Sequence, residues 1–316
     1  MLILQLLYLL IGLFLLWGGA ELLVKGSSSI AIGFGVRPLV VGLTIVAMGT
    51  SSPELAVSLF AALANTKDLS LANIIGSNIA NIGLVVGISA MIKKLTFEKS
   101  LFRSEIPILV FSTLLFSFMS WDGLISMLDG IVLLICFVLF LVYMVKRSLN
   151  DRSAAKSSAD FVDIKNNPKK MLKQGLFILS GLVGLVAGSF LIVESAEFIA
   201  RFFGVSTFII GVSVVAVGTS LPELAISAVG AARGRADLAI GNAIGSNLFN
   251  TLFVLAVVAV ITPIPVDRSL FKLHYPFMIG FTLLVVPLMW TKFRLTRTEG
   301  AMLFAAYVAF LFFLFI

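Results

Sequence analysis

Residues 47–56 read AMGTSSPELA, and residues 216–225 read AVGTSLPELA. Two further stretches follow at matching distances, NIIGSNIAN at 73–81 and NAIGSNLFN at 242–250. The shared letters are Gly, Thr, Ser, Pro, Glu and Asn, whereas chance similarity between apolar segments would match Leu and Ile. The chain therefore contains an internal duplication, and the fold has to accommodate both copies.

The duplication extends well beyond these motifs. Residues 39–81 align on residues 208–250 without gaps, at a constant offset of 169, and about 20 of the 43 aligned positions are identical. Around the copies the chain is strongly apolar. Of its 316 residues, 59% are hydrophobic and only 12% are charged, and the mean hydropathy is +1.11. Soluble domains carry about 25% charged residues, so this composition excludes a soluble enzyme, a disordered chain and a nucleic-acid-binding domain.

Apolar stretches between charge clusters predict an all-α membrane protein with ten transmembrane helices. A membrane-spanning helix needs about 20 apolar residues, and these segments are continuous rather than alternating, unlike the strands of an outer-membrane barrel. The predicted spans are 2–24, 38–64, 70–92, 104–120, 124–146, 174–200, 206–232, 238–261, 271–290 and 298–316. They form two five-helix repeats, 1–146 and 174–316, joined by a polar linker at 147–173.

The basic residues predict the orientation. Of the 23 Lys and Arg residues, all but Lys67, Arg201, Arg268 and Lys272 lie in loops that follow odd-numbered spans. By the positive-inside rule these loops are cytoplasmic. The linker 147–173 is then cytoplasmic, and both termini are extracytoplasmic, as expected for a cell (inner) membrane protein. Charges spread over every second loop do not form a nucleic-acid-binding patch.

The two copies are expected to be inverted. The first begins in the second span and the second begins in the seventh, so they cross the membrane in opposite directions. Inverted repeats with broken helices around a midplane site are the architecture of secondary transporters.

Each copy places one carboxylate, Glu54 or Glu223, near the middle of an apolar span. An ionisable group at that depth is costly unless it is paired, and it is a functional-site hypothesis by default. A basic partner inside the bundle would offer a purely structural explanation, but no Lys or Arg lies at comparable depth in any predicted span. The missing partner is therefore expected to be a cation.

The neighbouring residues offer further oxygen atoms. Pro53 and Pro222 lack an N–H, which frees the carbonyls of Gly49 and Gly218 to turn towards an ion. Ser77 and Asn81 lie four residues apart on one helix face, as do their counterparts in the second copy; helix–helix packing is the alternative reading of these residues. The candidate side chains around the carboxylates are Thr50, Ser51, Ser77, Asn81, Thr219, Ser220, Ser246 and Asn250.

All of these donors are hard oxygens, which disfavours zinc and copper. The single cysteine, Cys136, and the single histidine, His274, cannot build a sulfur or imidazole site. Calcium accepts six to eight flexible oxygen ligands, whereas magnesium requires an octahedron. Two carboxylates can be neutralised by one Ca2+ or by several Na+, and mutually exclusive occupancy of one anionic site is the physical basis of antiport.

The duplicated motifs, Gly-Thr-Ser-x-Pro-Glu followed by Gly-Ser-Asn-x-x-Asn, closely resemble the α-repeats of the calcium/cation antiporter superfamily, with the prokaryotic sodium/calcium exchanger branch nearest. The resemblance implies an eight-helix core across which the first and sixth spans slide. Glycines in these two spans would give smooth sliding surfaces: Gly12, Gly18, Gly19, Gly181, Gly184 and Gly188.

The resemblance also implies the ion ligands. It assigns the Ala47 and Ala216 carbonyls together with Thr50, Ser51, Glu54, Ser77, Asn81, Thr219, Ser220, Glu223, Ser246 and Asn250. Some relatives have Asp where this chain has Asn81 or Asn250, so potassium co-transport is disfavoured here. In the family three Na+ are exchanged for one Ca2+, which moves one net charge per cycle.

The resulting hypothesis is Na+-driven Ca2+ extrusion, with Na+, Ca2+ and the lipid bilayer as the only partners and no cofactor. H+/Ca2+ antiport through the same fold is the nearest alternative, although neither repeat has the Ala-Glu-His motif usual in proton exchangers. A cation channel lacks a filter loop in this sequence, and a membrane-embedded enzyme lacks a nucleophile–base pair. No nucleic acid or obligatory protein partner is expected.

Overall fold

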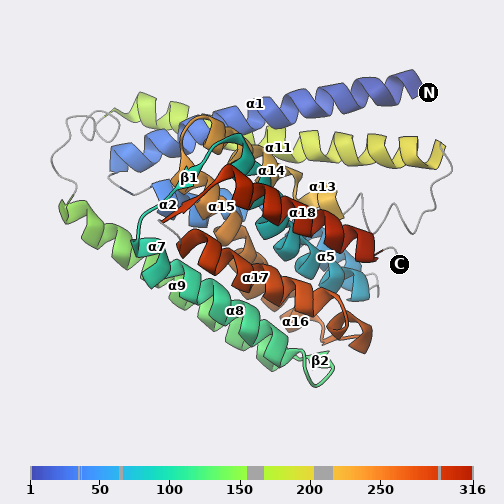
Figure 1. Cartoon of the computed structure of the whole chain (residues 1–316). Coiled ribbons are helices and arrows are strands. Elements are labelled where there is room, and N and C mark those ends of the chain that lie inside the picture. The colour runs from blue at the N-terminus through green and yellow to red at the C-terminus, as the bar shows by residue number, and fades with distance from the viewer. Residues whose placement is uncertain are drawn as a thin grey trace.

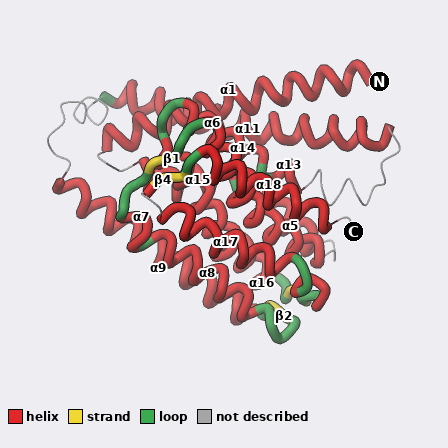
Figure 2. The backbone as a smooth tube through the Cα atoms, viewed as in Figure 1, coloured by secondary structure: helices red, strands yellow, loops and turns green. Residues whose placement is uncertain are grey.

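The computed structural model describes residues 2–34, 36, 38–63, 67–154, 167–202, 216–290 and 293–314 and is helical almost throughout (Figures 1 and 2). The helices of the first half are α1 (Leu2–Phe34), α2 (Pro38–Val41), η1 (Gly42–Val46), α3 (Ala47–Thr50), α4 (Ser52–Leu63), α5 (Lys67–Ala80), η2 (Asn81–Val86), α6 (Gly87–Ile92), α7 (Ser100–Arg103), α8 (Glu105–Met119) and α9 (Met127–Ala154). Those of the second half are α11 (Pro168–Phe202), α13 (Ala216–Thr219), α14 (Leu221–Ala232), α15 (Ala236–Phe249), η4 (Asn250–Val254), α16 (Leu255–Ile261), η5 (Arg268–Phe271), α17 (His274–Trp290) and α18 (Arg297–Leu314). Segments η1, η2 and η4 are π-helical, and η5 is a 3-10 helix.

The helices follow the ten predicted spans in order. In the described part of the chain, seven helices are long and apolar enough to cross a membrane, and the pair Leu39–Thr50 and Ser52–Leu63 forms one more span with a bend of 43°. The remaining two spans correspond to α14, which is shorter, and to α18. The first part of the seventh predicted span, residues 206–215, lies outside the described residues.

Three helices extend beyond the membrane spans predicted for them. Helix α1 continues to Phe34 instead of ending near residue 24, α9 continues to Ala154, and α11 begins at Pro168. The ends of the predicted linker are therefore helical. Boundaries drawn where charge begins mark the edge of the membrane, but a helix continues into water wherever its residues tolerate helical geometry.

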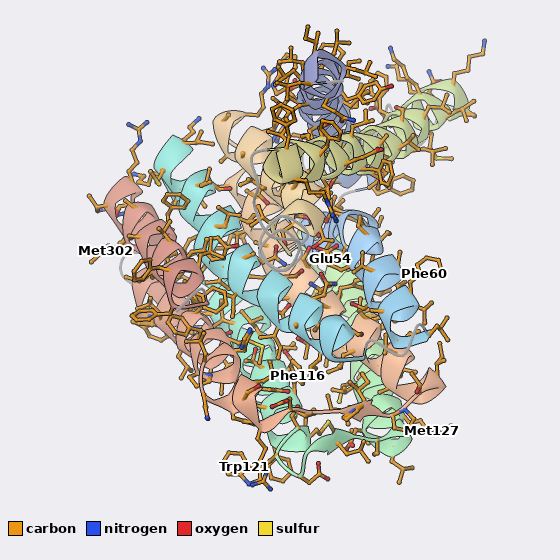
Figure 3. All side chains as sticks on the ribbon, turned by 90° about the vertical axis from the view of Figure 1, so that its right-hand side faces the viewer. Glu54, Phe60, Phe116, Trp121, Met127 and Met302 are labelled. Atoms are coloured by element: carbon orange, nitrogen blue, oxygen red, sulfur yellow. The ribbon has the colours of Figure 1, made fainter. Side chains whose placement is uncertain are left out.

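The centre of the molecule is formed by two equivalent units. Helices α5 to α6 and α15 to α16 are mostly buried, whereas α1, α9 and α11 are mostly exposed. Helices α4, α8 and α17 pack around these units, as do α9 and α18. The outer surface is apolar: Phe60, Trp121 and Met302 point outward in Figure 3 and are 71%, 77% and 64% exposed. Such a surface requires a lipid environment, and the protein is a multi-pass membrane protein.

Two short antiparallel ribbons join the halves. Strand β1 (Leu95–Thr96) pairs with β4 (Arg294–Leu295), and β2 (Leu124–Ile125) pairs with β3 (Ile264–Pro265). Strands β1 and β2 belong to the first repeat and β3 and β4 to the second, so each ribbon combines one strand from each repeat. Strands β1 and β3 are equivalent, since adding the repeat offset of 169 to the positions of β1 gives those of β3. The two repeats are interlocked, with β1 and β4 next to each other in Figure 2.

Helices α1 and α11 run side by side in opposite directions along one flank of the molecule (Figure 1). A Cβ atom added to Gly19 would lie 2.8 Å from the Gly181 carbonyl oxygen, and one added to Gly188 would lie 2.7 Å from the Gly12 carbonyl oxygen. Positions 12 and 181 are related by the offset of 169, as are 19 and 188, so a pseudo-two-fold axis passes between the helices.

These contacts correct the prediction of smooth sliding surfaces. Gly12, Gly19, Gly181 and Gly188 bring the two backbones into direct contact, which holds α1 and α11 together as one unit rather than smoothing their contact with the core. A Cβ atom on Gly18 would meet nothing within 4 Å, so Gly18 has no packing role of this kind.

Candidate functional site

Both predicted carboxylates follow a break in a helix. Ser51 separates α3 from α4 and has φ −86° and ψ 12°, and Ser220 separates α13 from α14 with φ −86° and ψ 3°. Glu54 and Glu223 lie in the first turn after these breaks. Helix breaks next to a site are a feature of transporters that bind cations with half-helices.

The partner helices change geometry at two of the predicted ligands. Helix α5 becomes π-helical at Asn81, and α15 becomes π-helical at its counterpart, Asn250. Single π-helical turns interrupt the regular hydrogen-bond ladder and occur frequently at functional sites. The sequence motif gave no sign of this change.

The predicted ligand side chains are buried together. Glu54 and Glu223 are 0% exposed, as are Ser77, Asn81 and Asn250. The other described members of the set are also buried: Thr50, Ser51, Thr219, Ser220 and Ser246. The backbone of Ala216 belongs to α13, but its side chain lies outside the described residues.

Many of these buried polar atoms have no hydrogen-bond partner among the described residues. Such atoms include both carboxylate oxygens of Glu54, Oε2 of Glu223, the hydroxyls of Ser77 and Ser220, and both amide atoms of Asn81 and Asn250. Buried polar groups are normally satisfied, and each exception needs an explanation. Others lie elsewhere in the described residues, such as Ser27 and Ser89, but nine of these atoms belong to the predicted ligand set, as expected for a site that binds a polar or charged species.

The two halves of the site differ. Oε1 of Glu223 accepts hydrogen bonds from Ser51 Oγ at 2.8 Å and from Ser246 Oγ at 3.4 Å. Glu54 accepts none from the described residues, and the Ser77 hydroxyl lies next to it without hydrogen-bond geometry. The hydrogen bond from Ser51 of the first repeat to Glu223 of the second brings the two half-sites together.

No basic side chain of the described residues neutralises these carboxylates. Arg147 forms an ion pair with Glu105, and Arg233 pairs with Glu21 at 2.6 Å. Within the same residues no cluster of three or more His, Cys, Asp or Glu side chains could hold a metal ion. Any cation in this site would therefore rest on two carboxylates supplemented by neutral oxygens.

The carbonyl of Gly218 departs from the prediction that it turns towards an ion. It accepts a hydrogen bond of 2.6 Å from Ser189 Oγ on α11. The proline at position 222 does free this carbonyl, but a hydroxyl of the neighbouring helix uses it. In the first repeat, the position equivalent to Ser189 is Ala20, which cannot make this bond.

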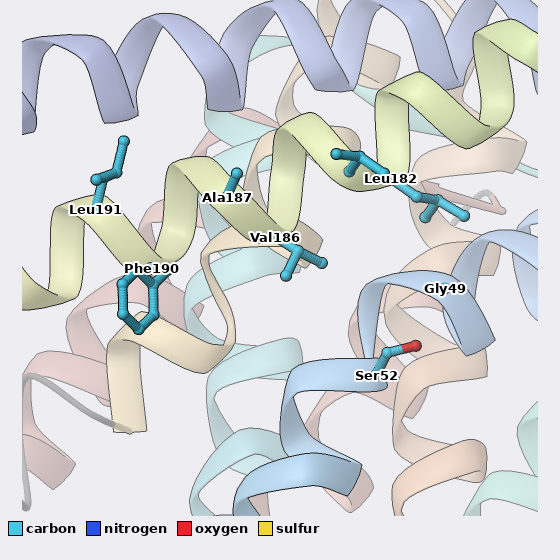
Figure 4. A pocket seen from close by; sticks show the side chains of 8 residues that line it. Gly49, Ser52, Leu182, Val186, Ala187, Phe190 and Leu191 are labelled. Carbon is cyan, nitrogen blue, oxygen red and sulfur yellow. The ribbon is translucent and has the colours of Figure 1, made fainter.

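A largely apolar cleft of about 650 Å³ lies between α11 and the break of the second span (Figure 4). Gly49 and Ser52 line it on one side, and α11 contributes Leu182, Val183, Val186, Ala187, Phe190 and Leu191. Ser52 is exposed, whereas the adjacent Ser51 is buried. The cleft therefore ends next to the candidate ligands without exposing them.

Two buried asparagines at the site were absent from the predicted ligand set. Asn73 and Asn242 contact the Glu, Ser and Thr residues around the breaks. Their signal in the sequence is that they are identical at equivalent positions of the two repeats, four residues before Ser77 and Ser246. The motif shows their importance, but not which side chains they contact.

Comparisons with known proteins agree with this architecture. The sequence profile described as "Sodium/calcium exchanger protein" matches residues 4–146 and 173–316. The chain is 34% identical to the inner membrane protein YrbG of Escherichia coli strain K12, over 90% of this chain and 88% of YrbG. It is 32% identical to the sodium/calcium exchanger MaX1 of Methanosarcina acetivorans, over 98% of both chains.

The solved structures agree as well. A structure of the sodium-calcium exchanger NCX_Mj soaked with Na+ and Sr2+ superposes with a TM-score of 0.85, at 34% identity and over 98% of both chains. This match over nearly the whole chain is consistent with a ten-helix inverted repeat. The chain belongs to the sodium/calcium exchanger family of the calcium/cation antiporter superfamily.

Proposed function

We propose that this antiporter exchanges Na+ for Ca2+ and, in the cell, extrudes Ca2+ at the expense of the inward Na+ gradient. The observation that carries this proposal is the pair Glu54 and Glu223, fully buried and surrounded by oxygen atoms that have no hydrogen-bond partner among the described residues. The names of MaX1 and NCX_Mj support it, since both are called sodium/calcium exchangers.

The chemistry of the site fits these two ions. Two buried carboxylates without a basic partner are costly, and a bound cation offsets that cost. Hydroxyl, amide and carbonyl oxygens from four broken or π-helical segments supply an irregular, adaptable shell. Such a shell suits Ca2+, which tolerates variable geometry, better than Mg2+, which requires an octahedron.

Exchange follows from competition between the two ion species for the same pair of carboxylates. Either one Ca2+ or several Na+ can neutralise the two carboxylates, so binding of one ion species displaces the other. If three Na+ are exchanged for one Ca2+, one net charge crosses per cycle, and a membrane potential of 100 mV contributes about 2.3 kcal/mol. In this proposal the unit formed by α1 and α11 moves across the remaining helices and exposes the site to each side in turn.

The function is tested in proteoliposomes loaded with Na+ and diluted into Na+-free buffer containing radioactive Ca2+. We expect Ca2+ uptake that requires internal Na+, is stimulated by an inside-positive potential, and is unaffected by a proton ionophore. Internal K+ in place of Na+ should give no uptake. Excess external Mg2+ should inhibit far less than excess non-radioactive Ca2+.

The nearest alternative is H+/Ca2+ antiport, and the same vesicles distinguish it. A proton exchanger would take up Ca2+ on an imposed pH gradient without Na+, and the ionophore would abolish uptake. Absence of uptake on either gradient would refute both functions.

The proposed orientation can be tested with two cysteine variants in a Cys136→Ser background. Trp121 is exposed in the loop before β2, predicted to be extracytoplasmic, and Lys169 is exposed at the start of α11, predicted to be cytoplasmic. A membrane-impermeant thiol reagent added to spheroplasts should label Trp121→Cys directly and Lys169→Cys only after permeabilisation. The opposite labelling pattern would show that the protein is inserted the other way round.

Asn250 offers a test of the site's charge. The variant Asn250→Asp adds a third carboxyl group to a buried site that already holds two. At low pH the added group is neutral and transport should resemble the natural protein; as the pH rises and the group ionises, the Ca2+ transport rate should diverge from it. Identical pH profiles for the variant and the natural protein, measured between pH 5 and 9 (roughly the range of shifted carboxyl groups), would place Asn250 outside the site.

A further inference from the structure

Asn73 and Asn242 occupy equivalent positions of the two repeats and make equivalent contacts. Nδ2 of Asn73 donates to Ser58 Oγ at 3.0 Å and to the Glu54 carbonyl oxygen at 3.5 Å. Nδ2 of Asn242 donates to Ser227 Oγ at 3.0 Å and to the Glu223 carbonyl oxygen at 3.2 Å. The two amide hydrogens of each asparagine thereby fix the side chain, which comes from α5 or α15, against the broken helix of the same repeat, α4 or α14.

The amide oxygens, in contrast, reach across to the other repeat. Oδ1 of Asn242 accepts a hydrogen bond of 3.1 Å from Thr50 Oγ1, and Oδ1 of Asn73 accepts one of 3.4 Å from Thr219 Oγ1. All four residues are buried, with exposures between 0% and 6%. Each threonine at the end of a half-helix is therefore held by the asparagine of the opposite repeat.

The position of the hydroxyl proton decides what a threonine can bind. A hydroxyl group has one proton and two acceptor lone pairs. Thr50 Oγ1 also lies 3.3 Å from the Ala47 carbonyl oxygen, the usual acceptor for a threonine in a helix. This carbonyl already accepts the Ser51 N–H at 2.9 Å, and a hydroxyl proton that pointed there would occupy its second lone pair, the one that remains for a cation. A proton donated to Asn242 leaves both the carbonyl and the lone pairs of Thr50 available.

We infer that Asn242 and Asn73 are positioning residues that draw the hydroxyl protons of Thr50 and Thr219 away from the site, so that these threonines and the Ala47 carbonyl present only oxygen lone pairs to the transported cation. This inference rests on the proposed function, because it assigns the threonines to the cation site. It also explains why each asparagine is held by the broken helix of its own repeat and binds the threonine of the opposite repeat: the contact keeps the two half-sites in register.

A double-mutant cycle between Asn242 and Thr50 tests the inference in the full-length purified protein. The four proteins are the natural chain, Asn242→Ala, Thr50→Val and the double variant, and the measurement is the apparent Kd for Ca2+ and for Na+ from ion-dependent thermal stabilisation. We expect Asn242→Ala to weaken binding about tenfold, in line with the loss of one oriented oxygen ligand. The double variant should bind no more weakly than Thr50→Val alone, because Asn242 acts through the threonine hydroxyl.

Ser227→Ala provides the matched control. It removes one partner of the Asn242 amide nitrogen without touching the Thr50 side, so it should lower the melting temperature without ions and leave both Kd values within about twofold, a change well below one hydrogen bond. Thr50→Ser keeps the hydroxyl and should restore the dependence on Asn242. If Asn242→Ala does not yield folded protein, the cycle between Asn73→Ala and Thr219→Val tests the equivalent contact.

The outcomes separate this inference from the proposed function. Equal effects of Asn242→Ala in the natural and Thr50→Val backgrounds would overturn the positioning role, as would a lowered melting temperature with unchanged Kd values. A natural protein that exchanges Na+ for Ca2+ but shows such an additive cycle would refute only the inference. A natural protein that binds neither ion would refute the proposed function itself.

Discussion

Replacing Glu54 or Glu223 by glutamine is expected to abolish Ca2+ transport while leaving a folded protein. Each variant removes one of two buried charges that have no basic partner in the described part of the chain. Breaking a buried pair between opposite charges costs about 3–5 kcal/mol, and a loss of 3 kcal/mol corresponds to about a 100-fold weaker affinity. Radioactive Ca2+ uptake and Ca2+-dependent thermal stabilisation would both detect such a loss.

The variants should also become more stable in the absence of ions. A buried carboxylate loses its hydration, a cost that a neutral amide bears far less, and the Glu54 carboxylate accepts no hydrogen bond from the described residues. Glu54→Gln should therefore raise the melting temperature without Ca2+ more than Glu223→Gln, whose carboxylate already accepts hydrogen bonds from Ser51 and Ser246.

Glu105 supplies the matched control for these glutamates. It is also 0% exposed, but it is paired with Arg147 outside the candidate site. Glu105→Gln should lower the melting temperature, because it weakens a buried ion pair, and should leave the Ca2+ affinity unchanged. If either site variant transported Ca2+ at more than about a tenth of the natural rate, a loss of less than 1.4 kcal/mol, the assignment of the two carboxylates would be wrong.

Replacing Gly19 or Gly188 by valine is expected to cause the second largest loss. Cβ atoms at these positions would lie within 2.8 Å of the backbone of the facing helix. Helices α1 and α11 would have to separate, and overpacking of this kind costs about 1–3 kcal/mol. Because α11 also contacts the broken helices through Ser189 and Leu182, its displacement should disturb the site as well. We expect a lower melting temperature and at least a tenfold lower transport rate, because a tenfold change corresponds to about 1.4 kcal/mol, which lies within the expected cost of overpacking.

Gly18 is the control for this prediction. It is adjacent to Gly19 in the same helix, but a Cβ atom there would meet nothing within 4 Å, and its counterpart in the second repeat is Ala187. Gly18→Val should retain nearly full stability and transport. Equal damage from Gly18→Val and Gly19→Val would indicate that helix propensity or lipid contact, rather than close backbone packing, explains the loss.

Much of the fold could be predicted because the membrane imposes simple rules. Apolar length determines the spans, and the repeat 39–81 with its copy determines their pairing and inversion. The family identity predicted from the motifs is confirmed. The boundaries at Phe34, Ala154 and Pro168 were not predictable, because hydropathy measures the edge of the bilayer and not the end of a helix.

In the candidate site, too, some features could be predicted from the sequence and others could not. The sequence predicted which side chains would gather, since depth and symmetry place Glu54 and Glu223 together, and the structure brings them together. It could not predict that Thr50 is held by Asn242, because that contact joins residues 192 positions apart. Nor could it predict the hydrogen bond from Ser189 to Gly218, because the freed carbonyl has several neighbours and only the packing of α11 selects one.

The interlocked ribbons have a consequence for how the protein is made. When the first half leaves the ribosome, β1 and β2 have no strand to pair with, and α1 lacks the helix that fills its glycine face. From the end of the first repeat at residue 146, about 150 further residues must be synthesised before α11, β3 and β4 are all present. The nascent first half is therefore an open, lipid-embedded intermediate with exposed strand edges. It has to persist in the membrane, without misassembling, until the second repeat has been inserted.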